Sequence, residues 1–336
     1  MTRSATTLAF SFAAAVLATL HGEPAQAQLD TSAFVSAAGG DSIGCGSSGT
    51  PCATLGFALG RLKPGGEILF LTPDSYAGFT ITQAVSIRND GIGEVLIEAQ
   101  ILGGIVIAAG AGDVVSLRGL TINGFAHARV GINIGTASAV HIQNCIVTGF
   151  QDTGFPADGG HSAFGISLAP SGRTQMFVSD TLIYNNGAAS FTGGILIEPQ
   201  NANSAADAVL DRVHLENNVD GILIDGAVAA GSAGSHVVVR DSVMSGNVGS
   251  GIHAFTQSGK SPAFVSVERS SMVRNGASGI LADGPGATVL LSDSAITRNG
   301  TGISTINGGQ LISYRNNRNN NNLGAEGAAT GFFGLF

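Results

Sequence analysis

The sequence repeats a short phrase at intervals of about 30 residues. The phrase is an asparagine followed by the pair Gly-Ile, as at Asn299, Gly302 and Ile303. The glycines of the pairs are Gly131, Gly165, Gly194, Gly221, Gly251, Gly279 and Gly302. A period of this size is typical of solenoids, in which each unit buries its apolar side only against its neighbours. The repeat therefore predicts one elongated domain rather than two compact ones.

Aligned on the Gly-Ile pair, the apolar residues form columns with the spacing of short strands. One column marks a first strand, with Leu117, Ile142, Val178, Leu210, Val239, Val267 and Leu291. The next marks a second strand, with Ile122, Val147, Ile183, Leu215, Met244, Met272 and Ile296. A third strand begins at each Gly-Ile pair and has inward residues at alternate positions, such as Ile222 and Ile224. The 50 glycines and the absence of Trp also favour short strands joined by tight turns.

Three strands per coil that all run the same way predict an all-β fold, a single-stranded parallel β-helix with coils about 4.8 Å apart. We expect this solenoid to span residues 67–315. Residues 51–66 are expected to contain an amphipathic capping helix, which begins after Thr50 and Pro51 and ends in the Lys-Pro-Gly-Gly run at 63–66. Residues 28–50 form a polar lead, and residues 316–336 form a closing polar coil and an apolar C-terminal cap.

The first 27 residues have the pattern of a secretory signal peptide. Arg3 precedes an apolar run at residues 7–20, which is too short to cross a bilayer, and residues 25–27 form a small-x-small cleavage site. We therefore expect export, removal of residues 1–27 and a mature chain that begins near Gln28, located in the periplasm or outside the cell. No transmembrane segment is expected after that removal.

The three cysteines fit an exported chain. Cys45 and Cys52 flank a short loop that a disulfide could close in an oxidising compartment. Cys145 is left over, and it falls in a column of the repeat that alternation places inside the coil. A buried structural thiol is therefore favoured over a nucleophile.

The asparagine of the repeat is expected to be structural. The column consists of Asn186, Asn218, Asn247, Asn275 and Asn299. Stacked at one bend, each of these residues would tolerate left-handed backbone and bond the amide of the next.

Charged residues also form columns, at the turn after the first strand. One column alternates in sign, with Asp180, Arg212, Asp241, Arg269 and Asp293. The column beside it contains Asp211, Arg240 and Glu268. Opposite charges on neighbouring coils attract one another across the stack, so these residues are predicted to form ladders rather than a catalytic centre.

These features together resemble the right-handed parallel β-helix proteins of the pectin-lyase-like superfamily. The resemblance rests on the helix followed by a strand at residues 54–68, the asparagine bend and the serial Gly-Ile strands, and it covers about residues 34 to 330. More narrowly, the chain is similar to secreted bacterial β-helix proteins whose biochemical role is not established. The resemblance implies a right-handed coil, which the general preference for right-handed crossovers also favours. It is specific for the fold and does not specify an activity.

The outer side of the third strand has the most suggestive polar residues. Alternation places Glu198, Asp225 and Asp283 there, with His253 in the adjacent column. Glu198 and Asp225 would stand about 5 Å apart, as in a retaining glycosidase, and clustered oxygens could instead hold Ca²⁺. The simpler interpretation is that Asp-Gly pairs form turns and that Pro199 ends a strand.

Asp220 is a further candidate, because the run from Asn218 to Asp220 resembles the Asn-x-Asp motif of polygalacturonases. The rest of that signature is missing, since there is no Asp-Asp pair on the next coil, no Gly-His-Gly and no Arg-x-Lys. A single acid cannot act as both base and acid in inverting hydrolysis.

One irregular loop, at residues 151–164, interrupts the repeat. It contains Asp152, Asp158 and His161 in a Gly-rich setting, where a binding site often lies. Asp158 and His161 would supply two metal ligands without a visible third, so a solvated loop is the favoured interpretation.

These observations favour an exported binding protein or scaffold that interacts with polysaccharide or a cell-surface glycan, without a cofactor. The alternatives are a polysaccharide lyase or glycoside hydrolase with an acidic site on an outer face, and an adhesin or surface-structure component. A net charge of −8 gives no attraction for nucleic acid. Platforms for sugar stacking are sparse, with Phe177, Tyr184 and Phe255 expected to face outward. The oligomeric state stays open.

The charge columns yield a first test. We expect Arg240→Glu to lower the melting temperature, because a third acid would then lie between Asp211 and Glu268. Calorimetry at low salt measures the effect, and added salt should reduce it. An unchanged melting temperature would count against the alignment of the columns.

Overall fold

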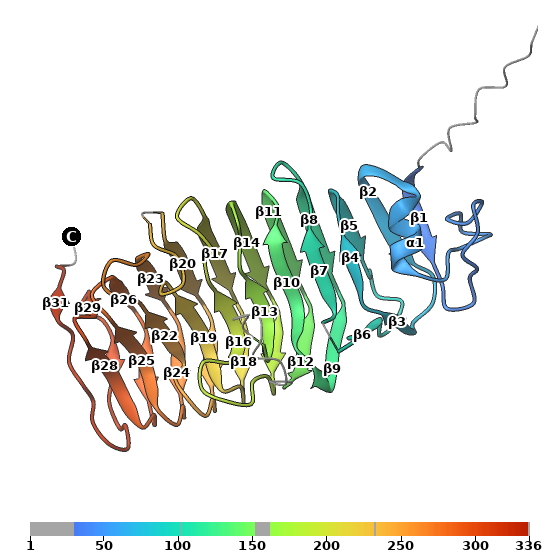
Figure 1. Cartoon of the computed structure of the whole chain (residues 1–336). Helices are drawn as coiled ribbons and strands as arrows, with labels where there is room; N and C mark the ends of the chain where they lie inside the picture. The colour runs from blue at the N-terminus through green and yellow to red at the C-terminus, as the bar shows by residue number, and fades with distance from the viewer. Residues whose placement is uncertain (1–29, 102, 152–161, 232, 335–336) are drawn as a thin grey trace, which may run out of the picture.

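The structure is a computed structural model that describes residues 30–101, 103–151, 162–231 and 233–334. Within these residues the chain winds into a solenoid whose coils each add strands to three long sheets (Figure 1). All pairings between the named strands are parallel, as between β17 and β20 (Ala205–Asp211 and Ser235–Arg240). The expected all-β parallel β-helix is therefore confirmed.

Apart from the two ends of the twelve-stranded sheet, each sheet takes every third strand of the chain. The twelve-stranded sheet contains β1 (Asp30–Val35), β2 (Leu62–Phe70), β5 (Val85–Arg88), β8 (Val114–Arg118), β11 (Ala139–Gln143), β14 (Arg173–Ser179), β17, β20, β23 (Ala263–Glu268), β26 (Ala287–Ser292), β29 (Gln310–Ser313) and β31 (Gly331–Phe332). The ten-stranded sheet contains β3 (Ser75–Ala77), β6 (Leu96–Glu98), β9 (Thr121–Ala128), β12 (Ile146–Phe150), β15 (Leu182–Tyr184), β18 (His214–Glu216), β21 (Val243–Ser245), β24 (Ser271–Val273), β27 (Ala295–Thr297) and β30 (Arg318–Asn319). The nine-stranded sheet contains β4 (Phe79–Ile81), β7 (Ile105–Ala108), β10 (Val130–Thr136), β13 (Phe164–Leu168), β16 (Gly193–Ile197), β19 (Asp220–Asp225), β22 (Ile252–Phe255), β25 (Ser278–Asp283) and β28 (Thr301–Ile306).

The apolar columns of the sequence match the register of the sheets. Leu210 pairs with Val239 in the twelve-stranded sheet, Leu215 with Met244 in the ten-stranded sheet. In the nine-stranded sheet Ile195 pairs with Ile222. The side chains of these columns are buried between the three sheets, where they form one continuous core. The expected alignment of the columns is confirmed.

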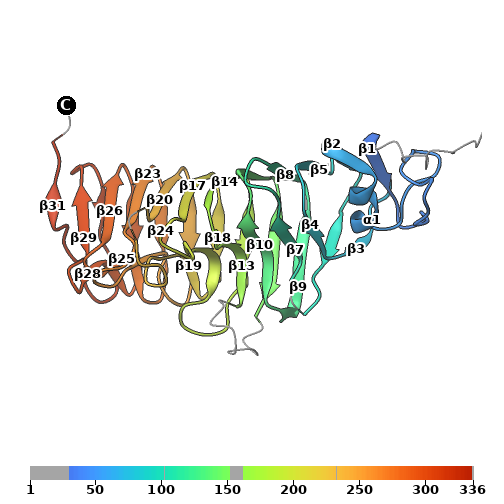
Figure 2. The same cartoon turned by 45° about the horizontal axis from the view of Figure 1, so that its top comes forward.

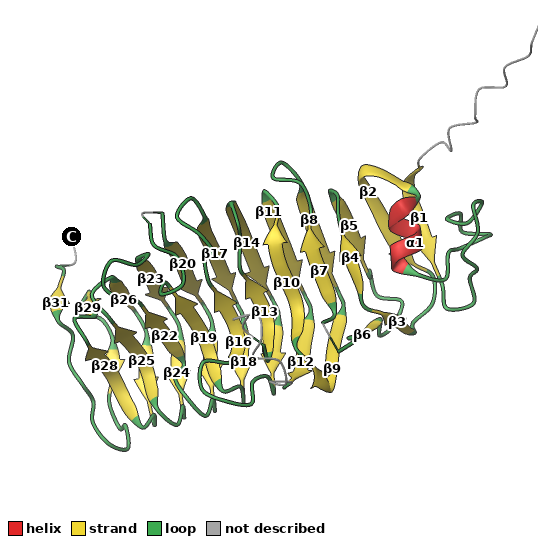
Figure 3. Ribbon diagram, in the orientation of Figure 1, coloured by secondary structure: helices red, strands yellow, loops and turns green. Residues whose placement is uncertain are grey.

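A single helix, α1 (Leu55–Gly60), lies across the N-terminal end of the described solenoid (Figure 3). Thr54 is its N-cap, and the helix buries Leu55, Ala58 and Leu59 against the first coils. It is shorter than the expected stretch 51–66, because residues 63–66 do not end it but lie in β2. Gly65 has φ +85° in that strand, so the Pro-Gly-Gly run shapes a strand rather than a helix terminus.

The solenoid also extends beyond the expected limits 67–315. In the lead, β1 pairs with β2, and the predicted disulfide between Cys45 and Cys52 is present. At the other end β31 pairs with β29, while Phe332 and Phe333 stay about half-exposed. The C-terminal stretch therefore adds a strand to the edge of a sheet rather than forming a buried cap.

The asparagine column forms a continuous ladder of buried amides. The Nδ2 group of Asn218 donates to Oδ1 of Asn247 at 3.3 Å, and that of Asn247 donates to Asn275 at 2.8 Å. Each Oδ1 also accepts from the backbone N–H of the preceding asparagine, as Asn247 does from Asn218 at 3.0 Å. The ladder runs through Asn186, Asn218, Asn247, Asn275 and Asn299 and continues to Asn322. The predicted structural role of these asparagines is confirmed.

The expected left-handed backbone, however, lies one residue earlier. Asn185 and Asn217 have φ values of 56° and 53°, and arginine takes this position at Arg274 and Arg298. The ladder asparagines themselves are not among the residues with positive φ. The asparagine is therefore required for its amide and not for its tolerance of a left-handed conformation.

The glycine of each Gly-Ile pair is required by close packing at the same bend. A Cβ atom added at Gly194 or Gly221 would lie 2.6 or 2.4 Å from the carbonyl oxygen of the matching glycine on the next coil. It would also approach the Nδ2 atom of an asparagine of the ladder, at 3.2 Å in both cases. Because backbone atoms cannot give way, any side chain here would push two coils apart.

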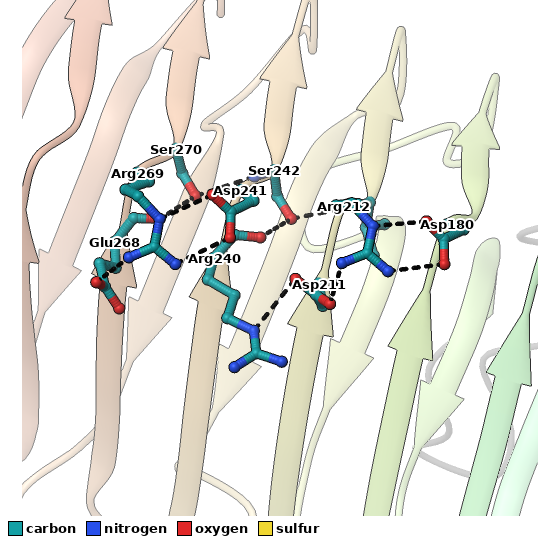
Figure 4. A network of polar contacts seen from close by, with 10 residues as sticks. Asp180, Asp211, Arg212, Arg240, Asp241, Ser242, Glu268, Arg269 and Ser270 are labelled. Carbon is teal, nitrogen blue, oxygen red and sulfur yellow. Dashed lines mark hydrogen bonds and ion pairs between the residues drawn. The ribbon is translucent and has the colours of Figure 1, made fainter.

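The charged columns form ion pairs on the surface (Figure 4). Arg212 donates from Nε and Nη2 to the two carboxylate oxygens of Asp180, at 2.7 and 2.9 Å. Arg269 holds Asp241 in the same way, and Arg240 donates to Asp211 at 3.1 Å. The hydrogen bonds from Arg212 and Arg269 lower the pKa of Asp180 and of Asp241. The charged columns are present as separate arginine–carboxylate pairs, in which Arg212, Arg240 and Arg269 each reach back to the preceding coil. The predicted column is not a continuous ladder, since no ion pair joins Arg269 to Asp293 among the described residues.

The amide ladder gives a second prediction. Asn247→Ala removes the acceptor for two donors of Asn218 and the donors to Leu215 and Asn275, so buried polar groups lose their partners. We expect a loss of about 2–3 kcal/mol in the free energy of unfolding, measured by urea titration. The matched control is Asn203→Ala in an exposed loop, which should change little. Equal effects of the two substitutions would contradict the role of the ladder.

Candidate functional site

The sequence-predicted polar residues do lie on the outer side of the nine-stranded sheet. Asp220 pairs with Gly193 at the start of β19, and His253 lies between Leu223 and Leu281 in the next column. Asp225 is at the end of β19, opposite Phe255. Asp225 and His253 lie on the outer side where alternation placed them, and Asp220 joins them there, but their surroundings are more enclosed than an open surface.

Much of this face is covered. Leu196 and Leu223, on the outer side of neighbouring strands, are fully buried with Phe164, and Phe255 packs against them. Glu198 and Asp225 are 2% and 5% exposed. Glu198 and Asp225 therefore do not lie on an open surface, and an apolar cluster lies beside them.

The three outer carboxylates come from three separate coils. Glu198 follows Ile197, and Asp225 follows Ile224. Because Ile197 pairs with Ile224, the two acids lie next to one another on neighbouring coils. Asp225 accepts a hydrogen bond from the N–H of Ala227 at 2.7 Å, which is the turn-forming role the Asp-Gly pair indicated.

Asp283 lies two coils away from Asp225. Phe255 is between them in the register, and Asp283 accepts from Nδ2 of Asn307 at 2.7 Å. Asp283 is therefore separated from the other two acids by a coil that has Phe255 at this position. Among the described residues, one cluster has three side chains close enough to bind a metal ion, namely Asp41, Cys45 and Cys52. The two cysteines of this cluster are joined in the disulfide.

Asp220 and His253 form the closest polar pair on this face. Nδ1 of His253 lies 3.6 Å from Oδ2 of Asp220, and the backbone N–H of Ser250 donates to Oδ1 of Asp220 at 2.7 Å. Both residues are 7% exposed. They border a hollow of about 440 Å³, which the loop between β15 and β16 encloses on one side. Figure 2 shows this yellow-green loop projecting from the side of the solenoid near β18.

The remaining predicted binding residues, Asp152, Asp158 and His161, lie outside the described residues.

A second surface lies on the outer side of the twelve-stranded sheet, and the sequence pattern did not single it out. There His141 stacks on Phe177 with ring centres 4.8 Å apart, and His236 stacks on Phe264 at 5.4 Å. A hollow of about 360 Å³ lies beside Phe264, with Val238, Leu290 and Phe333 in its walls. We call this surface, from Phe177 to Phe333, the ring face. Phe264 could have been found from the sequence, because it alternates with the inward Ala263 and Val265.

The comparisons with known proteins agree with this geometry. A family model described as "Right handed beta helix region" matches residues 103–318, which is more than half of the chain. The chain belongs to this right-handed β-helix family. The resemblance to this fold and its right-handed coil are thereby confirmed. No curated protein matches the chain.

Two solved structures are similar to this β-helix. The pectate lyase Pel9A superposes with a TM-score of 0.54 and 13% identity, covering 91% of this chain and 80% of that one. The alginate lyase from Paenibacillus sp. str. FPU-7 superposes with a TM-score of 0.49 and 17% identity, covering 84% of this chain and 97% of that one. At these identities the likeness concerns the fold. In the described part of this β-helix, no helix is long and apolar enough to cross a membrane.

Cys145 is the one free thiol of the described residues, and its position decides its reactivity. The side chain is buried in the core of the coil, as predicted, and Sγ contacts the carbonyl oxygen of Gln143 at 3.3 Å. Burial raises the pKa of the Cys145 thiol from 9.0 to about 11. The thiolate is therefore scarce in the folded protein, which does not suit a nucleophile.

This predicts a difference between folded and unfolded protein. At about pH 8, iodoacetamide should label Cys145 slowly in the native β-helix and fast in urea. Because the pKa of 9.0 rises to about 11 on folding, the thiol stabilises the fold fully below pH 9.0 and this contribution is lost as the pH rises toward 11. Mass spectrometry measures the labelling, with Cys145→Ser as the blank. Rapid labelling of the native protein would contradict the buried position.

Proposed function

We propose that this protein is an exported, non-catalytic β-helix that binds a polysaccharide or a cell-surface glycan along its ring face. The observation that carries the proposal is the row of rings on the outer side of the twelve-stranded sheet, of which Phe264 is 43% exposed and Phe177 is half-buried. His141 and Phe177, and then His236 and Phe264, present stacked rings on neighbouring coils. Sugar rings have apolar C–H faces, and exposed aromatic rings are the side chains on which such faces stack.

The residues between the two ring pairs are suited to binding an extended polysaccharide chain. Phe177 pairs with Val209 and Val209 with Val238, so an apolar line crosses the strands from one ring pair toward the other. Polar side chains border this line, among them Asp207 and Gln175, which offer hydrogen-bonding groups for hydroxyls. Coils stand about 4.8 Å apart, so successive coils offer a regular series of contacts to a polymer that repeats its own unit.

The chemistry of the ring face favours binding over catalysis. In the hollow beside Phe264 the titratable residue is His236, whose Nδ1 lies 3.4 Å from Asp207. The acids that the sequence suggested for catalysis are on the nine-stranded sheet, and three of the four, Glu198, Asp220 and Asp225, are buried. Hydrolysis or elimination requires groups that act together on one bond, and the ring face offers no convergent pair of acids among the described residues.

Export supports an encounter with such glycans. The predicted signal peptide at residues 1–27 would place the chain in the periplasm or outside the cell. The disulfide between Cys45 and Cys52 fits an oxidising compartment of this kind.

Affinity electrophoresis of the purified protein in gels that contain acidic or neutral polysaccharides, with and without Ca²⁺, tests the proposal. We expect retardation by at least one polymer, without release of new reducing ends or unsaturated products. Phe264→Ala should weaken binding by about fivefold, or about 1 kcal/mol, because one stacking ring is lost. The matched control is Phe57→Ala on α1, since Phe57 is 37% exposed and Phe264 is 43% exposed.

Three results would overturn the proposal. In the first, no polymer of the panel retards the protein. In the second, Phe264→Ala binds as well as the unchanged protein. In the third, turnover of a polysaccharide is lost in Asp220→Asn or Asp225→Asn, which would establish an enzyme with its site on the nine-stranded sheet.

A further inference from the structure

We infer that the hollow beside Asp220 and His253 is a second ligand site, which binds a single pyranose ring that has hydroxyl or ammonium groups and no carboxylate. It lies on the nine-stranded sheet, away from the ring face, so it does not rest on the function proposed above. Its floor is formed by Asp220 and His253. Its walls are residues 188–191 on one side, with Val219, Val248 and Gly249 around the rest.

The carboxylate of Asp220 is held in place before any ligand arrives. Its Oδ1 atom accepts the N–H of Ser250 at 2.7 Å, which fixes the plane of the group. Its Oδ2 atom faces Nδ1 of His253 at 3.6 Å, a separation longer than a good hydrogen bond. Oδ2 therefore has acceptor capacity left for a donor from a ligand.

The imidazole of His253 is incompletely hydrogen-bonded. The ring is more than nine-tenths buried, and among the described residues Nε2 has no hydrogen-bond partner. The rings around it belong to Phe191 and Phe255, at 5.4 and 6.0 Å between centres, and neither can form a conventional hydrogen bond. A buried polar atom left without a partner is unfavourable, so such an atom beside a hollow points to a ligand group or water that completes its bonding.

Phe191 is held over the hollow in an unfavourable conformation. Its φ is 59°, in the left-handed region that bulky residues avoid, and its side chain is 42% exposed. Its ring and that of Phe255 pack in a T-shaped arrangement, with centres 5.4 Å apart. Strained residues of this kind are concentrated at ligand sites, and a partly exposed ring offers a face for stacking.

The wall that includes Phe191 is tied to the floor. The hydroxyl of Thr192 accepts the N–H groups of Ala188 and Ala189, at 3.1 and 3.2 Å. The carbonyl of Thr192 accepts the N–H of Asp220 at 3.0 Å. The ring and the carboxylate are therefore positioned relative to one another without a ligand, which lowers the entropy lost on binding.

The composition of the hollow defines the class of ligand. Stacking on Phe191 requires a flat apolar face, and Asp220 and His253 require hydroxyl or ammonium donors around its edge. A pyranose ring combines these features. No Arg or Lys is among the residues that line the hollow, and Asp220 would repel a carboxylate. A volume of about 440 Å³ suits one ring rather than a polymer.

NMR of protein labelled at its seven histidines tests the site. The probes are methyl glycosides of glucose and galactose, glucosamine, and galacturonic acid as the charged comparison. We expect one histidine resonance to shift with a dissociation constant of about 1 mM for at least one of the first three probes, and less than a tenth of that affinity for galacturonic acid. The His253→Gln variant identifies that resonance by its loss.

Variants test whether the probes bind at this site rather than elsewhere on the protein. Asp220→Asn keeps the acceptor for Ser250 but loses the charge, and Phe191→Ala loses the stacking ring. Each should weaken binding at least tenfold. Phe125→Ala is the matched control, because Phe125 also has positive φ, 49°, and is 49% exposed on another coil. It should bind the probes as the unchanged protein does. Phe264→Ala should also bind them normally, because that substitution affects only the ring face.

The inference is overturned if no probe shifts the His253 resonance, or if galacturonic acid binds as well as the uncharged sugars. It is also overturned if Phe191→Ala, with an unchanged melting curve, retains full binding. If a variant fails to fold, the comparison among probes on the unchanged protein still decides the inference.

Discussion

The rest of the structure depends on the close stacking of coils at the asparagine bend, which determines how neighbouring coils align. At this bend the glycine of one coil lies so near the glycine carbonyl of the next that no side chain fits, and the buried amides join the coils without a gap. A slip of one residue would place a side chain against a backbone oxygen and remove the partners of the amides. The bend therefore fixes the register of neighbouring coils at this point, and the strand pairs of the three sheets continue from it.

A fixed register turns sequence columns into surfaces. Every coil contributes one residue to each outward column, so like residues accumulate along the axis of the solenoid. At the turn after the first strand this produces the arginine–carboxylate pairs around Arg212 and Arg269. On the flat outer side of the twelve-stranded sheet it produces the ring face. The same rule therefore generates a surface that stabilises the stack and a surface that presents rings to solvent.

The fold could be predicted from the sequence because its determinants are periodic. The inward columns, the buried Cys145, the amide ladder and the charged pairs all follow from alternation within a repeat that recurs about every 30 residues. The strand at residues 63–66 could not be predicted from turn-forming residues, since pairing with the neighbouring strands overrides the local preference of Pro-Gly-Gly. The position of the left-handed residue was also missed, because Asn185 and Asn186 both suit it and only the amide bonds distinguish them.

The candidate site was predicted less well, because loops do not obey the repeat. Alternation placed Glu198, Asp225 and His253 on the correct side of the nine-stranded sheet, but it did not indicate what covers that side. The outward Leu196 and Leu223 were the available signal, since two leucines on neighbouring coils require an apolar cover. Where such a cover closes over the sheet, polar residues become structural. The cover stops at Phe191, and there Asp220 and His253 border a hollow. The edge of the covered region is thus the place on this face where a buried carboxylate and an incompletely bonded imidazole meet solvent, and the regular repeat contains no information about where that edge lies.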